Sequence, residues 1–194
     1  MTALLNYLAQ HFDIPALDWI TEKLGCPLLD TVMPWVTKLG DGGIFWIAVA
    51  AILLFIPKYR KAGLSMGIAL LMGLLLCNLT LKPLVARIRP YDFVATHYGR
   101  NIALLVSTPH DFSFPSGHTI ASFEGAVALF VHNKKLGIPA LVLAFLVAFS
   151  RLYLYLHYAT DVIASILLGT ALAFLGCWLA KKGCSLLENR KLGK

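Results

Sequence analysis

Three short segments of this 194-residue chain carry ionisable side chains beside long apolar runs. Their sequences are KPLVARIRP at residues 82–90, FPSGHT at 114–119 and SRLYLYLHYATD at 150–161. Ionisable residues within or beside apolar spans are costly to keep and usually serve a function. We therefore expect the chemistry of the protein to reside in these three segments.

Together the segments offer groups that suit a tetrahedral oxyanion such as phosphate. The cations are Lys82, Arg89 and Arg151, and Ser116 and Gly117 open a predicted helix. Guanidinium groups and the free backbone N–H groups of a helix start both bind phosphoryl oxygens. The sequence therefore predicts a phosphate pocket where the three segments meet.

Two histidines in these segments could divide the work of phosphoryl transfer. His157 could attack phosphorus, while His118 protonates the leaving oxygen and later activates water. Asp161 follows His157 by four residues, so its carboxylate could accept a hydrogen bond from Nδ1–H and fix the reactive tautomer. Taken alone, this spacing is also typical of a structural helix pair, so the assignment depends on the other segments.

The three segments resemble the signatures of the type 2 phosphatidic acid phosphatase superfamily of membrane lipid phosphatases. These signatures are KxxxxxxRP, PSGH and SRxxxxxHxxxD, and the sequence matches every defined position. The matching residues are Lys82, Arg89, Pro90, Pro115, Ser116, Gly117, His118, Ser150, Arg151, His157 and Asp161. The resemblance implies that His157 forms a phosphohistidine, that Asp161 holds its ring, and that His118 is the general acid and then base.

The resemblance also assigns the phosphoryl-binding groups. They are Lys82, Arg89, Arg151, Ser116 and the Gly117 N–H. No metal or other cofactor is expected, because these cations and the helix dipole take the role that magnesium has in kinases.

The composition is typical of an integral membrane protein. The chain is 58% hydrophobic and 14% charged, with a mean hydropathy of +0.73. A net charge of +7 would suit nucleic acid, but the basic residues lie mainly between apolar runs, where they set membrane orientation. The four cysteines lack metal-site spacing and are not expected to form disulfides.

Five apolar stretches predict an all-α, polytopic helical bundle in a single domain, 1–194, with its transmembrane part at 42–182. The stretches are residues 42–57, 62–81, 116–132, 136–156 and 162–180. Charged residues interrupt every apolar run of segment 1–40, which predicts interfacial amphipathic helices or, equally, a short cap folded on the bundle. Relatives commonly have six spans, and this chain reaches six only if that segment inserts.

Basic residues predict the orientation, because lysine and arginine accumulate on the cytoplasmic side. They lie after the first, third and fifth stretches: Lys58, Arg60, Lys61, Lys134, Lys135, Lys181, Lys182, Arg190, Lys191 and Lys194. Parity then places the three motif segments at the extracytoplasmic face of the cell membrane and the C-terminus in the cytoplasm.

The predicted function is metal-independent hydrolysis of a lipid phosphate or diphosphate. The expected partners are the lipid substrate and membrane lipids, and no nucleic acid is expected. Undecaprenyl diphosphate is the first candidate substrate, followed by phosphatidylglycerol phosphate and phosphatidic acid. Phosphoryl transfer to another lipid at the same site is an alternative. A transporter with buried charges is an alternative of another class, although the charges lie at one face rather than along a path.

Some ionisable residues match no motif position. Four of them lie in the first motif segment and in the stretch between it and the second: Arg87, His97, Arg100 and His110. We expect these to be solvated or to contact anionic lipid. Glu124 lies inside the third stretch, where a charged carboxylate is costly, so we expect it to be protonated or paired with a polar group such as Asn78.

Overall fold

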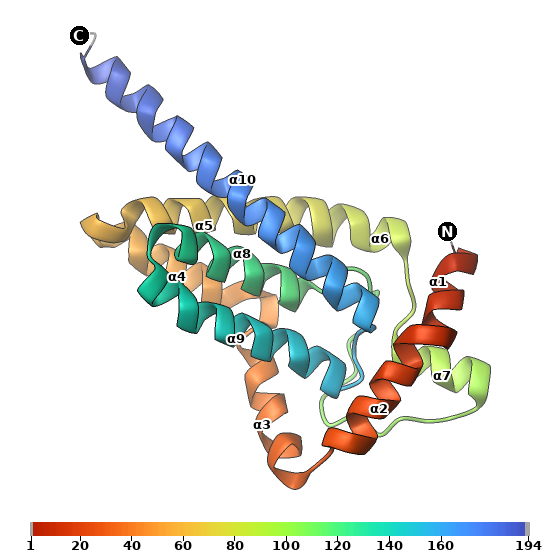
Figure 1. The fold of residues 1–194 in the computed structure, drawn as a ribbon. Helices are drawn as coiled ribbons and strands as arrows, with labels where there is room; N and C mark the ends of the chain where they lie inside the picture. The colour runs from red at the N-terminus through yellow and green to blue at the C-terminus, as the bar shows by residue number, and fades with distance from the viewer. Residues whose placement is uncertain (1, 193–194) are drawn as a thin grey trace.

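The computed structural model describes the backbone of residues 2–192 and the side chains of residues 3–186. Over that range the chain forms helices and loops without a strand (Figure 1). The predicted all-α bundle is thus confirmed. The side chains of Arg190, Lys191 and Lys194, expected on the cytoplasmic side, lie outside the described residues.

The helices follow one another with short connections up to Tyr98. The first are α1 (Thr2–Leu8), the π-helical η1 (Ala9–Asp13), α2 (Ile14–Leu24), α3 (Pro27–Lys38), η2 (Asp41–Gly43) and α4 (Ile44–Phe55). Next come η3 (Pro57–Tyr59), α5 (Arg60–Gly73), the π-helical η4 (Leu74–Leu81), α6 (Lys82–Val85) and α7 (Pro90–Tyr98). The last are α8 (Gly117–His132), α9 (Lys134–Tyr153) and α10 (Ala159–Leu192).

Local sequence signals explain helix ends at both ends of the bundle. Pro90 begins α7, and Gly99 ends it with a φ of 62°, a conformation that glycine adopts without strain. Asn133 separates α8 from α9, and its side-chain oxygen accepts a hydrogen bond of 3.2 Å from the Leu136 N–H. These signals set the lengths of the elements that carry the motifs.

Helices form at all five predicted stretches, but fewer qualify as spans by length and composition. Within the described residues, the helices that qualify as spans are Pro57–Tyr98, Lys134–Tyr153 and Ala159–Leu186. The helices α3 and α4 qualify together as a fourth span bent by 42°. The 16-residue α8 is too short to qualify. It lies in the middle of the bundle, where neighbouring helices rather than lipid cover most of it.

The central helix α8 packs against α4, α5, α9 and α10. Trp46 of α4 lies buried against it and donates a hydrogen bond of 3.0 Å to the Ser122 hydroxyl, so its indole N–H is satisfied. A Cβ at Gly169 of α10 would lie 2.8 Å from the Ile120 carbonyl oxygen. Such close backbone approach is typical of helix packing in membranes, where small residues form the interface.

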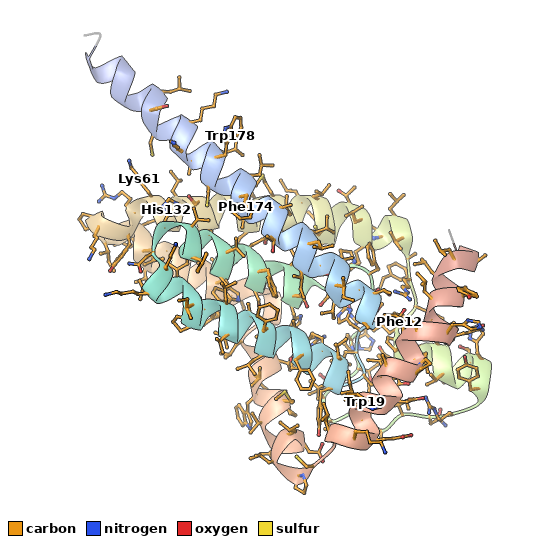
Figure 2. All side chains as sticks on the ribbon, viewed as in Figure 1. Phe12, Trp19, Lys61, His132, Phe174 and Trp178 are labelled. Atoms are coloured by element: carbon orange, nitrogen blue, oxygen red, sulfur yellow. The ribbon has the colours of Figure 1, made fainter. Side chains whose placement is uncertain are left out.

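The N-terminal segment folds on one end of the bundle, beside α7 (Figure 1). Ile14 and Leu17 are buried in a cluster with Phe93 and the turn between α9 and α10. Phe12 and Trp19 are about half exposed on the same segment (Figure 2). This part of the N-terminal segment thus packs on the bundle as the cap alternative describes, whereas α3 qualifies with α4 as part of a span. Contact of the exposed aromatic rings with the membrane interface stays a prediction.

The loops group at the two ends of the bundle as parity requires. Lys58 and Lys61 share a small cavity with His132 and Asn133, so the loops after the first and third stretches lie together. Figure 2 shows Lys61 and His132 at this end. The three motif segments lie at the opposite end (Figure 1). Which side of the membrane each end faces stays a prediction.

Candidate active site

A cavity of about 910 Å³ contains side chains from all three motif segments. Lys82 and Arg89 come from α6 and the residue before α7, and His118 comes from the first turn of α8. Arg151 and His157 come from the end of α9 and the turn that follows. The predicted convergence of the motif segments is thus present in the fold.

The turn after α9 is a Schellman motif that reverses the chain. The Leu156 N–H donates to the Arg151 carbonyl at 3.0 Å, and the Tyr155 N–H donates to the Leu152 carbonyl at 2.9 Å. Because of this reversal, His157 returns to the cavity wall beside Arg151.

Tyr155 occupies the left-handed position of this motif, with a φ of 59°. Glycine is usual there, and another residue costs roughly 1–2 kcal/mol. The Tyr155 hydroxyl donates to Asp18 of α2 at 2.8 Å and accepts from Arg100 at 2.9 Å. These bonds tie the strained turn to the N-terminal segment.

His157 presents Nε2 to the cavity and Nδ1 to the protein interior. Its ring is 1% exposed, and Nε2 lies 3.3 Å from Arg89 Nη1. Burial, and then the charges of Arg151 and Arg89, hold the pKa of His157 well below its usual value. The imidazole is therefore neutral near pH 7, which is the form that a nucleophile requires.

Asp161 lies beside His157 but does not form the direct hydrogen bond that the sequence suggested. Its Oδ2 lies 3.7 Å from His157 Nδ1, too far for a hydrogen bond. The Ser113 hydroxyl lies beside both groups, donating to Asp161 at 2.5 Å and lying 3.5 Å from Nδ1. Asp161 Oδ2 also accepts from the Tyr158 N–H at 3.2 Å, which caps α10. The expected direct bond is thus replaced by contact through Ser113.

Two of the predicted phosphate-binding cations are paired with Asp111, which the sequence did not single out. Arg89 Nη2 donates to Asp111 Oδ1 at 2.5 Å, and Lys82 pairs with the other carboxylate oxygen. Burial would raise the pKa of Asp111, but the ion pairs with Lys82 and then Arg89 hold it well below its usual range. The Asp111 side chain is 52% exposed. A substrate phosphate that approaches Lys82 and Arg89 therefore meets this charged carboxylate at the surface of the cavity.

Replacing Asp111 by asparagine should lower KM for a lipid phosphate by about fivefold, with kcat changed less than about twofold. A substrate phosphate must displace or share the contacts of Asp111, and a neutral amide competes less strongly for Lys82 and Arg89. Steady-state kinetics of the purified variant in detergent would measure the change. A raised KM would instead mean that Asp111 helps to hold the substrate.

Arg151 has donors that the protein leaves free. Nη1 donates to the Thr37 hydroxyl at 2.6 Å, but Nε is buried and has no hydrogen-bond partner among the described residues. Gly117 also lines the cavity, as predicted for a phosphate-binding backbone position.

Ser116 differs from its predicted placement. It is buried and does not line the cavity, because its hydroxyl accepts from Thr119 at 3.0 Å and its N–H donates to Ser165 at 2.9 Å. These contacts fix the start of α8 against α10. They leave Ser116 with a role in placing the neighbouring Gly117.

His118 faces a carboxylate that sequence reasoning missed. Its Nε2 lies 2.8 Å from Asp41 Oδ1, in the 3₁₀ turn before α4. Such a partner orients the imidazole for proton transfer.

Glu124 lies in the same cavity, further along α8, and is 1% exposed. No hydrogen bond joins it to Asn78: Glu124 Oε1 and Asn78 Oδ1 both lack partners among the described residues. The carboxyl packs against Gly73, where a Cβ would collide with it. The structure therefore does not pair the two residues, and a protonated Glu124 stays a prediction.

Arg87 is not the solvated loop residue that we expected. It is 6% exposed and forms ion pairs with Asp13 and Asp161. Arg87 does not line the cavity, whereas Arg89, two residues later in the chain, does. Arg87 therefore points behind the site while Arg89 points into it.

The other residues outside the motifs are exposed, as expected: His97, Arg100 and His110. His97 stacks on Phe93, with ring centroids 4.0 Å apart. Arg100 pairs with Asp18 at 2.8 Å.

Beyond the charged groups the cavity continues between α4 and α5. Apolar side chains line this part: Ile47, Ala51, Leu54, Leu71 and Leu74. The cavity therefore joins a cationic end to an apolar end, as an amphiphile requires.

Comparison with known proteins agrees with this geometry. The PAP2 superfamily model matches residues 62–183. An undecaprenyl-diphosphatase of Sulfolobus acidocaldarius is 35% identical over 156 residues, covering 80% of this chain and 72% of the relative. An undecaprenyl-diphosphatase of Bacillus subtilis is 29% identical over 148 residues, covering 76% and 73%.

A solved structure extends the likeness to the fold. The crystal structure of a PAP2-type phosphatidylglycerolphosphate phosphatase from Bacillus subtilis superposes with a TM-score of 0.67 at 30% identity, covering 93% of this chain and 94% of the other. The family model and the first relative both cover most of the chain. Six motif residues line the cavity: Lys82, Arg89, Gly117, His118, Arg151 and His157. The chain belongs to the PAP2 superfamily, the type 2 phosphatidic acid phosphatases that its three motifs resemble.

Proposed function

We propose that this protein is a membrane phosphatase that hydrolyses a lipid phosphate or diphosphate through a phosphohistidine at His157. One observation carries the proposal: a buried, neutral imidazole presents Nε2 to a cavity beside Arg89 and Arg151, whose Nε has no hydrogen-bond partner among the described residues. A nucleophile next to fixed cations is what attack on an anionic phosphoryl group requires.

The first step forms the bond between His157 Nε2 and phosphorus. The bond from phosphorus to the leaving oxygen breaks, and His118 donates its proton to that oxygen. The products are phosphohistidine and either a lipid alcohol, from a monoester, or a lipid monophosphate, from a diphosphate. Asp41, 2.8 Å from the His118 ring, orients the imidazole for this proton transfer.

The second step returns the enzyme to its starting state. His118, now neutral, takes a proton from water while the water oxygen attacks phosphorus. The bond between phosphorus and His157 breaks, and inorganic phosphate leaves. Lys82, Arg89, Arg151 and the Gly117 N–H bind the phosphoryl oxygens, so fixed protein charges neutralise the transition state and no metal is needed.

The substrate proposal rests on the two ends of the cavity and on the relatives. A cationic end suits the phosphate, and the apolar part between α4 and α5 suits the first segment of a lipid tail. Both named relatives are undecaprenyl-diphosphatases, so undecaprenyl diphosphate is the first candidate, followed by phosphatidylglycerol phosphate and phosphatidic acid. The basic loops at the far end support an extracytoplasmic site and a cytoplasmic C-terminus.

The test is phosphate release from several lipid phosphates by the purified protein in detergent with excess chelator. We expect full activity under chelation, and competitive inhibition by vanadate, which occupies the phosphoryl site. Activity lost to the chelator and restored by a divalent metal would refute the mechanism. Adding a second lipid alcohol and looking for its phosphorylation separates hydrolysis from transfer between lipids.

A further inference from the structure

We propose that Asp13 and Arg87 are positioning residues for the pair His157–Asp161, so that the N-terminal segment forms part of the active site. The inference rests on the proposed phosphohistidine mechanism. Neither residue belongs to a motif of the family, and Asp13 lies outside the residues that the family model matches.

Arg87 joins the N-terminal segment to the start of α10. Its Nη1 donates to Asp161 Oδ1 at 2.5 Å, and its Nη2 donates to Asp13 Oδ2 at 2.8 Å. The guanidinium also lies 3.7 Å from the centre of the Tyr158 ring. Arg87, Asp13 and Asp161 are all buried, so water screens these charges little.

Asp13 is held as tightly as Arg87. It lies in the π-helical η1, beside the first turn of α10, and is 0% exposed. Its Oδ1 accepts from the Thr160 N–H and its Oδ2 from the Thr160 hydroxyl, both at 2.8 Å. Asp13 therefore binds Arg87 and the residue directly before Asp161 at once.

The charges of the three residues explain why Asp13 is needed. Arg87 alone would neutralise Asp161, and a neutral pair stabilises a positive imidazole poorly. With Asp13 the cluster carries a net charge of −1, which acts on His157 through Ser113. His157 becomes cationic only when phosphorus bonds to Nε2, so the cluster stabilises the intermediate more than the resting enzyme.

The structure also fixes the direction in which Asp161 faces. Arg87 holds Oδ1, while Ser113 and the Tyr158 N–H hold Oδ2 on the side of the His157 ring. Removing Arg87 would leave two buried carboxylates without a counter-charge and would destabilise the whole protein. Asp13 is therefore the better residue to change.

The experiment is the full-length Asp13→Asn variant assayed in detergent beside wild type. We expect kcat to fall about 10–100-fold, as for other residues that orient a catalytic group through a second residue. KM and the inhibition constant of inorganic phosphate should change less than about threefold, because Lys82, Arg89 and Arg151 keep their places. The exposed Glu22→Gln in α2 is the matched control and should keep wild-type kinetics.

The split between kcat and KM separates positioning from a merely structural role. An unchanged kcat overturns the inference, and so does a parallel change of kcat, KM and phosphate inhibition. If Asp13→Asn does not fold, Thr160→Val decides: it removes the hydroxyl that bonds Asp13 and Arg87 but keeps both charges. We then expect a smaller fall in kcat, about two- to tenfold, at constant KM.

Failure of this inference differs from failure of the proposed function. If His157→Ala is inactive while Asp13→Asn and Thr160→Val behave as wild type, the mechanism holds and the positioning role is wrong. If His157→Ala is active, the phosphohistidine mechanism itself is wrong.

Discussion

Replacing His157 by alanine should lower kcat by at least about 10⁴-fold, because the variant loses the atom that bonds to phosphorus. The remaining cations can still bind the phosphate, so the variant should still bind vanadate or inorganic phosphate weakly. Phosphate release from a lipid phosphate measures the loss. Labelling with a ³²P-substrate, quenched in alkali because phosphohistidine is unstable in acid, should give labelled wild-type protein and unlabelled variant.

His157→Gln serves as a second variant of more similar size, for which the same loss is expected. Both variants must elute in gel filtration and melt as wild type does, since the ring is buried in the turn after α9. Wild-type turnover by either variant would show that another group attacks the substrate or that water attacks directly.

Replacing His118 by alanine should lower kcat for a lipid phosphate by about 10²–10⁴-fold, the usual range for a general acid and base. The first step loses the proton donor for the leaving oxygen, and the second loses the base that activates water. An aryl phosphate with a good leaving group needs no proton donor, so its first step should proceed. Labelled phosphohistidine should then accumulate in His118→Ala, although none forms in His157→Ala.

Asp41→Asn is the graded control, because it keeps the imidazole and removes its charged partner at 2.8 Å. Its effect should be smaller than that of His118→Ala and should act on the same steps. Failure of the His118→Ala protein to accumulate phosphohistidine from an aryl phosphate would mean that His118 is not the base of the second step.

Much of this architecture follows from the sequence, for physical reasons. Apolar runs long enough to be helices in lipid predicted where α4, α5, α8, α9 and α10 form. Alternation of the chain between the two ends of a bundle then placed the three motif segments together. That step needs no knowledge of individual side-chain positions, because each apolar span carries the chain from one end of the bundle to the other.

The N-terminal half of the bundle was harder to predict. Asp30 and Lys38 suggested that the region before α4 could not continue a span, yet α3 leads into α4 across a bend of 42°. Asp30 accepts a hydrogen bond of 2.6 Å from the Tyr153 hydroxyl. A carboxylate with a hydrogen-bond partner can pack on the bundle at little cost. The sequence alone does not reveal this partner, because Tyr153 lies 123 positions after Asp30.

The same limit explains the residues missed at the site. Asp111 and Ser113 lie in the stretch between α7 and α8, which has no periodicity to indicate which side chains face inward. Arg87 was misjudged because its burial depends on Asp13, 74 positions earlier in the chain. Long-range pairs of charges become visible only when the fold brings them together.

The left-handed turn at Tyr155 has a consequence for the speed of catalysis. Its strain is offset by bonds to Asp18 and Arg100, neither of which lines the cavity, so these bonds do not depend on a bound lipid. The backbone that carries His157 is therefore already reversed in the free enzyme. The free-energy cost of that geometry is met once, when the chain folds, and not again in each catalytic cycle.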